Sequence, residues 1–169
     1  MDSFRYVPEL RDLGVSIQTN VKTTLYSFTD YFRGFEKVAA IKSLFGGETE
    51  NVLSKLKVEF YSAKFGYMGV SDEDGHLLIS AHHLKTADPI VLYLDIFHEL
   101  HHVKQFQDGK ELFNMEFEYV DNPVEVEAYK ATVVEAKRIG LSDEAIKDYL
   151  KIEWITEEQH ARLVRAVGL

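Results

Sequence analysis

The 169-residue chain contains no cysteine. Disulfide bonds and thiolate metal ligands are therefore excluded, so any bound metal ion must be held by histidine or carboxylate side chains. No basic stretch followed by an apolar segment stands near Met1. No apolar run approaches the roughly 20 residues that a membrane-spanning helix needs. We therefore expect a soluble, cytoplasmic protein that has no membrane partner.

Basic residues are scarce relative to acidic ones. The chain has 19 Lys and Arg against 28 Asp and Glu, which gives a formal net charge of -9. Binding to a nucleic-acid backbone needs clustered basic residues, and we find no such cluster, so nucleic acid is not expected as a partner. The chain also lacks repeats and Pro/Gly/Ser-rich linkers, and its length favours a single domain over 1–169. The sequence leaves the oligomeric state open.

The pattern of apolar residues divides the domain into four parts. Residues 1–56 are expected to be helical, with one helix over 30–45. Alternating residues in 57–82 predict strands, and the acidic turn between the last two favours an antiparallel meander of about three strands. Two long helices follow in 88–140 and two shorter ones in 142–169. The expected fold is α+β, with this small sheet packed on a long buried active-site helix and further helices at both ends.

The boundaries of the two long helices carry clear signals. Asp88 is a good N-cap, Pro89 suits the first helical position, and Gly109 can end the first long helix. The first half of this helix is apolar almost all round, which predicts a central, buried position. The second long helix begins with Asn122 and Pro123 and ends near 140.

The first long helix contains the pattern His-Glu-x-x-His. His98 and His102 are four residues apart, so their side chains lie one turn apart on the same face, where both can bind one zinc ion. Glu99 lies about 100° further round the helix, beside the metal, where it can act as a general base. This pattern on a helix is typical of zinc hydrolases. The alternative is that both histidines lie at the solvated end of the helix, which becomes polar soon after them.

The next helix supplies the third ligand through a second motif. At this point the sequence resembles the gluzincin metallopeptidases, which carry His-Glu-x-x-His on one helix and Glu-x-x-Ala/Ser on the next. The second motif is Glu125 to Ala128 here, and the resemblance covers roughly 97–132. It implies that Glu125 completes a site for one Zn²⁺ with the two histidines. Glu127 is the alternative ligand, because Glu125 lies three residues after Asn122, where a glutamate often bonds back to the helix cap.

Other residues are weaker candidates for the site. In many gluzincins an acidic residue follows Ala/Ser and orients a zinc-bound histidine, but Tyr129 stands in that place here. Tyr129, Tyr119 and His160 are candidates for stabilising the transition state or supporting the ligands. Asp108 is a rival third ligand of metzincin type, although Gln105 occupies the position where that motif needs glycine.

These motifs lead to one main functional expectation. It is a zinc-dependent metallopeptidase that hydrolyses peptide bonds in a peptide or protein substrate, using a metal-activated water and Glu99 as general base. By the resemblance, strand 76–81 forms the rim of the cleft and binds substrate by strand addition. The alternative is a zinc-binding regulatory or interaction protein of the same fold, latent or inactive, with 142–169 covering the cleft. A third reading is a structural metal site with His101 or His160 as a fourth ligand.

Overall fold

The N-terminal part of the computed structural model, which describes residues 24–63 and 66–169, is built from short helices. The α-helices are α1 (Phe28–Tyr31), α2 (Ala39–Phe45) and α3 (Thr49–Lys55). The helix predicted over 30–45 is wrong as a single element, because Gly34 adopts a left-handed conformation with φ of 89° and breaks it. The helical prediction for residues 1–23 lies outside the described residues.

A small mixed sheet follows, in the order β1-β2-β4-β3. Its strands are β1 (Tyr26–Ser27), β2 (Lys57–Tyr61), β3 (Met68–Val70) and β4 (Leu77–Ser80). β2 pairs with β4 in parallel, with Phe60 opposite Ile79, and β3 and β1 are antiparallel to their neighbours. The α+β class is confirmed, but the antiparallel meander of three strands is wrong.

Burial explains why β4 lies inside the sheet. Leu77, Ile79 and Ser80 are at most 1% exposed, whereas β3 is short, contains Gly69 and suits an edge. The meander prediction assumed that strands adjacent in sequence pair with each other, and the burial of β4 overrides that tendency. Because β4 has partners on both sides, the predicted addition of a substrate strand at 76–81 is excluded.

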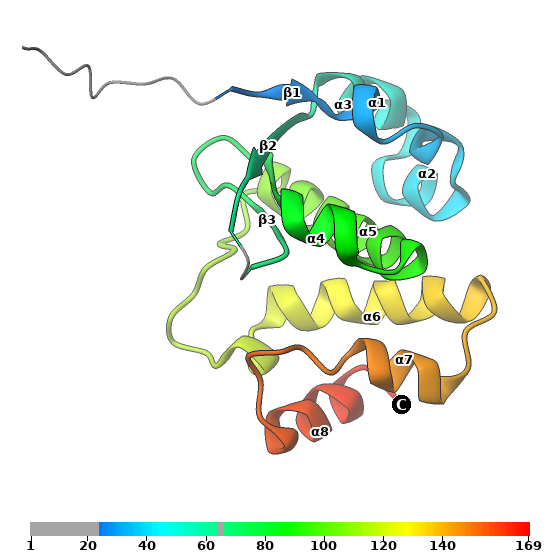
Figure 1. The fold of residues 1–169 in the computed structure, drawn as a ribbon, viewed down its shortest axis with the longest axis vertical. Coiled ribbons are helices and arrows are strands. Elements are labelled where there is room, and N and C mark those ends of the chain that lie inside the picture. Colours follow the sequence, from blue (N-terminus) through cyan, green and yellow to red (C-terminus); the bar gives the residue numbers. More distant parts are fainter. Residues whose placement is uncertain (1–23, 64–65) are drawn as a thin grey trace, which may run out of the picture.

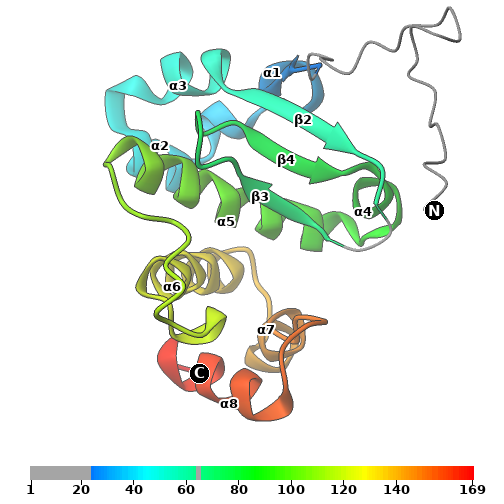
Figure 2. The ribbon, with the colours of Figure 1, turned by 90° about the vertical axis from the view of Figure 1, so that its left-hand side faces the viewer.

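The long helix that was expected at 88–108 is α5 (Pro89–Gln107), preceded by the short helix α4 (Ala81–Thr86). Asp88 caps α5, since its side chain accepts a hydrogen bond of 2.8 Å from the backbone N–H of Ile90. Figure 2 shows α5 lying across one face of the sheet. Ile79 of the sheet and Leu100 of α5 belong to the same buried core, so this prediction is confirmed.

The remaining helices are α6 (Pro123–Arg138), α7 (Asp143–Tyr149) and α8 (Glu157–Ala166). The predicted helix start at Asn122 is confirmed, since its side chain caps α6, and Ser142 and Thr156 cap α7 and α8 in the same way. The three helices enclose a second core, whose buried members include Leu94, Val133, Ile146 and Leu163. In Figure 1, α6 lies between α5 and the last two helices. The helix α5 lies at the boundary of the two cores, because its Leu100 belongs to the first and its Leu94 to the second. Among the described residues, no helix combines the length and the apolar character that a bilayer span requires.

Candidate metal centre

Three side chains from α5 and α6 converge on one point. His98 and His102 come from one face of α5, and Glu125 comes from the first turn of α6. The two histidine Nε2 atoms are 3.0 Å apart, and each lies 3.3 Å from Oε2 of Glu125. All three residues are at most 9% exposed. Within the described part of the chain, no other group of histidine and acidic side chains comes together in this way.

The spacing of these three atoms fits a bound metal ion. Four ligands at the usual zinc distances of about 2.0–2.1 Å are about 3.3–3.4 Å apart at the corners of a tetrahedron. The observed separations of 3.0 to 3.3 Å approach those of three such corners. Three protein ligands leave the fourth position for water or substrate, as in catalytic rather than structural zinc sites.

The charges of the three converging side chains also suit a cation. Burial alone would disfavour the carboxylate, but hydrogen bonds from His102 and His98 lower the pKa of Glu125 to about 2. Burial likewise opposes protonation of His102, yet its hydrogen bond to Glu125 and the charge of Glu99 raise its pKa to about 9. The site therefore favours positive charge. A proton on His102 supplies that charge, and a bound metal ion would supply it in place of the proton.

Gln105 fixes the orientation of the His102 ring by a hydrogen bond to Nδ1, on the side away from Glu125. The sequence did not predict this role. Its Nε2 donates to the carbonyl of Val124 at 3.0 Å and to Oε2 of Glu127 at 2.6 Å. These two acceptors fix the orientation of the amide, so Oε1 must accept from Nδ1–H of His102, at 2.7 Å. With its proton on Nδ1, a neutral His102 presents the lone pair of Nε2 to a metal.

The rival third ligands lie elsewhere. Glu127 receives hydrogen bonds from Gln105 and from Lys110, the latter at 2.7 Å, and its side chain is 53% exposed. Asp108 is exposed and forms an ion pair with Lys104 on the same helix. Neither belongs to the converging group, which contains Glu125 instead.

The two candidates for a fourth protein ligand do not join the group either. His101 packs its ring against Phe97, with centroids 5.0 Å apart, and burial lowers its pKa to about 4. His160 lies on α8, where its Nε2 is 2.9 Å from the carbonyl oxygen of Lys147. The geometry of the described residues thus offers three protein ligands and not four.

Glu99 is placed beside the ligands with a free oxygen. It is 8% exposed, and its Oε2 has no hydrogen-bond partner among the described residues. Burial raises the pKa of Glu99 against the opposing effect of the nearby His102 and His98. A carboxylate with a raised pKa can accept a proton and release it again during a reaction at neutral pH.

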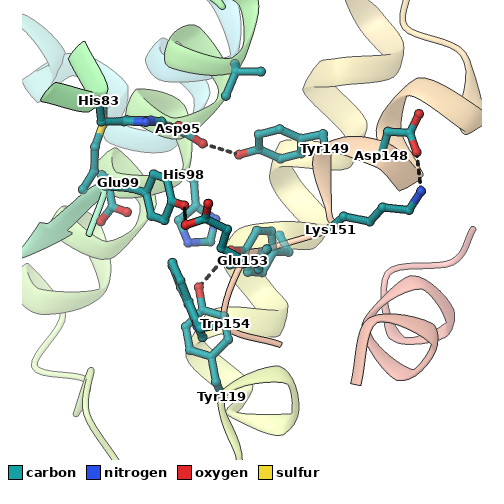
Figure 3. Close-up of a pocket in the computed structure, with 15 residues that line it drawn as sticks. His83, Asp95, His98, Glu99, Tyr119, Asp148, Tyr149, Lys151, Glu153 and Trp154 are labelled. Carbon is teal, nitrogen blue, oxygen red and sulfur yellow. Dashed lines mark hydrogen bonds and ion pairs between the residues drawn. The ribbon is translucent and has the colours of Figure 1, made fainter. Parts of the chain in front are cut away.

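Glu99 and His98 open onto a cavity of about 340 Å³, shown in Figure 3. Tyr119 and Tyr129 also line this cavity, with their hydroxyl oxygens 2.8 Å apart, whereas His160 does not. The ring of Tyr129 packs on His98 at a centroid distance of 4.1 Å. Nδ1 of His98 has no hydrogen-bond partner among the described residues, so no acidic group orients this histidine.

The rest of the cavity wall was not predicted. Asp95 accepts hydrogen bonds from Tyr149 at 2.9 Å and from His83 at 2.7 Å. Asp95 lies one turn before Glu99 on α5, and this spacing could have revealed it. Glu153 and Trp154, in the connection between α7 and α8, reach the cavity through tertiary packing, for which the sequence carries no local signal.

We found no match to this chain among protein-family models, curated proteins or solved structures. The interpretation of the site therefore depends on the residues and distances given above.

Proposed function

We propose that the chain is a zinc-dependent peptidase. The observation that carries this proposal is the convergence of His98, His102 and Glu125 next to Glu99, whose buried Oε2 has no partner among the described residues, with His98 and Glu99 lining a cavity. The resemblance to gluzincins agrees with this observation, because it concerns the order of the same residues in the sequence. Two imidazoles and one carboxylate favour zinc over calcium or magnesium, which prefer oxygen ligands.

The residues divide the work of hydrolysis between them. His98, His102 and Glu125 would hold the zinc ion, which when bound lowers the pKa of a water molecule and polarises the scissile carbonyl. Glu99 accepts a proton from the attacking water as the new C–O bond forms. It then gives that proton to the amide nitrogen, so that the C–N bond breaks with a neutral amine as leaving group.

The tyrosine pair provides a donor for the charge that develops on the carbonyl oxygen. Burial raises the pKa of both Tyr119 and Tyr129 well above the usual 10, so both stay protonated. One hydroxyl donates to the other, which leaves the second O–H free to donate to the oxyanion. A peptide would lie along β3, which has a strand on one side only and contributes Met68 to the cavity.

Bound metal and hydrolysis test this proposal together. Wild type, His102→Ala and Glu99→Gln are purified, loaded with zinc, dialysed and analysed for metal and for cleavage of an unfolded protein such as casein. We expect about one zinc per chain in wild type and in Glu99→Gln, and little in His102→Ala. Cleavage should fall at least about 100-fold in both variants. Wild type without zinc, or equal cleavage by wild type and Glu99→Gln, would refute the mechanism.

The connection between α7 and α8 favours a second candidate, a latent form of the same enzyme. Tyr67, before β3, donates a hydrogen bond to Glu153 and packs on Trp154, with ring centroids 5.4 Å apart. These contacts join the connection to the residue before β3, and all three side chains line the cavity. If these contacts restrain the entry of substrate, Tyr67→Phe, which removes only the hydroxyl, should cleave substrate faster than wild type. Unchanged or lower cleavage argues against latency.

Truncation before residue 142 is a poor test of latency. It would remove Ile146, Leu150 and Leu163, all fully buried in the second core. Loss of three such side chains, at about 2–5 kcal/mol each for truncation to alanine, would unfold the helical half rather than uncover a site.

A further inference from the structure

The cavity beside the metal centre carries unbalanced negative charge. Four carboxylates line it: Asp95, Glu99, Asp148 and Glu153. Asp148 is paired at 2.7 Å with Lys151, and both side chains are more than 60% exposed at the rim. Asp95 is bonded to His83 and Tyr149. Among the described residues, Glu99 and Glu153 have no cationic side chain bonded to them.

Glu153 is an exposed residue that also lines the cavity. Figure 3 shows its side chain pointing inward, on the side of the cavity where His98 and Glu99 lie. Its Oε2 accepts a hydrogen bond from Tyr67, while Oε1 makes none with a described residue. Burial and the neighbouring Glu153 raise the pKa of Tyr67 to about 12, so Tyr67 remains a donor and offers no positive charge.

The walls next to Glu153 are aromatic. Trp154 packs between Tyr67 and Tyr119, with ring centroids 5.4 and 5.6 Å away. Aromatic faces attract cations, and the methylene stems of lysine and arginine pack well on them. A second carboxylate that lines this space, Glu99, attracts the same kind of group.

We infer that the cavity recognises a positively charged group of the substrate, and that Glu153 is the residue that selects it. The group is a lysine or arginine side chain, or the free amino end of a peptide. This inference rests on the proposed function for the peptide nature of the substrate. A bound zinc ion does not remove the selection, since Glu99 and Glu125 together balance its two charges and leave Glu153 uncompensated.

Trp154 offers a direct readout, because it is the only tryptophan in the chain. Its fluorescence can follow binding to the zinc-loaded full chain without any requirement for hydrolysis. Four matched pentapeptides are titrated: three with blocked ends and arginine, citrulline or glutamate in the middle, and the citrulline peptide with a free amino end. Hydrolysis is followed in the same samples by chromatography. We expect the arginine peptide, the free-amine peptide or both to bind roughly five- to thirtyfold more tightly than blocked citrulline.

Substitution of the selecting carboxylate sharpens the test. Glu153→Gln keeps the size and the acceptor for Tyr67 but removes the charge, so it should abolish most of the preference for the cationic peptide. Glu116→Gln is the matched control, because Glu116 is exposed on the loop before α6 and does not line the cavity. This control should keep the full preference.

The outcomes separate this inference from the proposed function. A preference for arginine over citrulline that Glu153→Gln loses supports a side-chain site, and a preference for the free over the blocked end supports an amino-end site. Either result stands even if no peptide is cleaved, in which case the peptidase proposal fails alone. Cleavage without any preference for charge overturns the inference and leaves the peptidase intact. A preference retained by Glu153→Gln, or no saturable signal with any peptide at millimolar concentration, also overturns it.

Discussion

Gln105→Ala is the substitution that most directly tests how α5 builds the metal centre. Gln105 is 3% exposed and bonds to His102, to the Val124 carbonyl and to Glu127. Alanine removes all three hydrogen bonds while keeping a good helix former at this position. The ring of His102 then loses the acceptor that fixes its Nδ1 proton and its orientation.

Two separate effects should follow from Gln105→Ala. Loss of a partner behind a metal-binding histidine usually lowers metal affinity by about 10- to 100-fold, which corresponds to roughly 1.4–2.7 kcal/mol. The metal-free chain should also lose about 1–3 kcal/mol of stability, because Nδ1 of His102 is left buried without its acceptor. For a chain of this size each kcal/mol lowers the melting temperature by roughly 2–4 °C.

Zinc affinity is measured by competition with a chelator of known affinity, and stability by thermal unfolding in excess chelator. Gln107→Ala is the matched control, because Gln107 is exposed two residues further along the same helix and bonds to none of these groups. Equal zinc affinity in Gln105→Ala and Gln107→Ala would refute the role of Gln105 in orienting His102. A loss of stability with no loss of zinc affinity would reduce Gln105 to a packing residue.

Three further predictions follow from the same structure. Wild type in free zinc at about 100 times the Kd should be more stable than wild type in excess chelator by about 2.7 kcal/mol in the free energy of unfolding. This corresponds to a difference of roughly 5–10 °C in melting temperature. An unchanged melting temperature contradicts specific binding of zinc to the folded state. Ala128→Leu should lose about 1–3 kcal/mol and also zinc affinity, because Ala128 is 0% exposed and lies one turn from Glu125 on the face of α6 that meets α5; normal zinc content would show that the helices have room. Glu135→Gln should destabilise the chain at pH 7, because hydrogen bonds from Arg138 hold the pKa of buried Glu135 below the usual 4.5. That stability is present above pH 4.5 and is lost as pH falls below it, so urea unfolding should show the gap between wild type and variant narrowing as the pH is lowered from 4.5. A gap that stays constant with pH would exclude the charge as its source.

Local chemistry made the long helices and the ligand pair predictable. The pairs Asp88-Pro89 and Asn122-Pro123 mark helix starts. In each pair the first side chain can accept a hydrogen bond from the helix backbone, and the proline ring fixes the backbone angle of the first helical residue. That His98 and His102 share one face follows from helical periodicity alone. Neither the helix starts nor this histidine pair required knowledge of the rest of the chain. The choice of Glu125 over Glu127 required the resemblance, because helical geometry alone allows either carboxylate to face α5.

Features that depend on distant parts of the chain could not be predicted. The position of β4 between β2 and β3 depends on which strand buries most apolar surface once all are assembled. Trp154 meets Tyr67 only because α7 and α8 fold back over α6, and nothing near either residue indicates this contact. His83 reaches the cavity wall on α4, a short helix that the sequence pattern did not predict.

The position of α5 at the boundary of the two hydrophobic cores has a consequence for the lifetime of the chain. One core joins the sheet to α5, and the other joins Leu94 of α5 to α6, α7 and α8. His102 and Glu125 connect α5 to α6 across 23 positions of sequence. A metal ion bound between α5 and α6 would couple two units that can otherwise unfold separately. Without metal, the amides of α6–α8 should exchange their hydrogens before those of the sheet. Proteases would then meet a chain without metal in a partly open form, so a bound metal ion would lengthen the lifetime of each molecule.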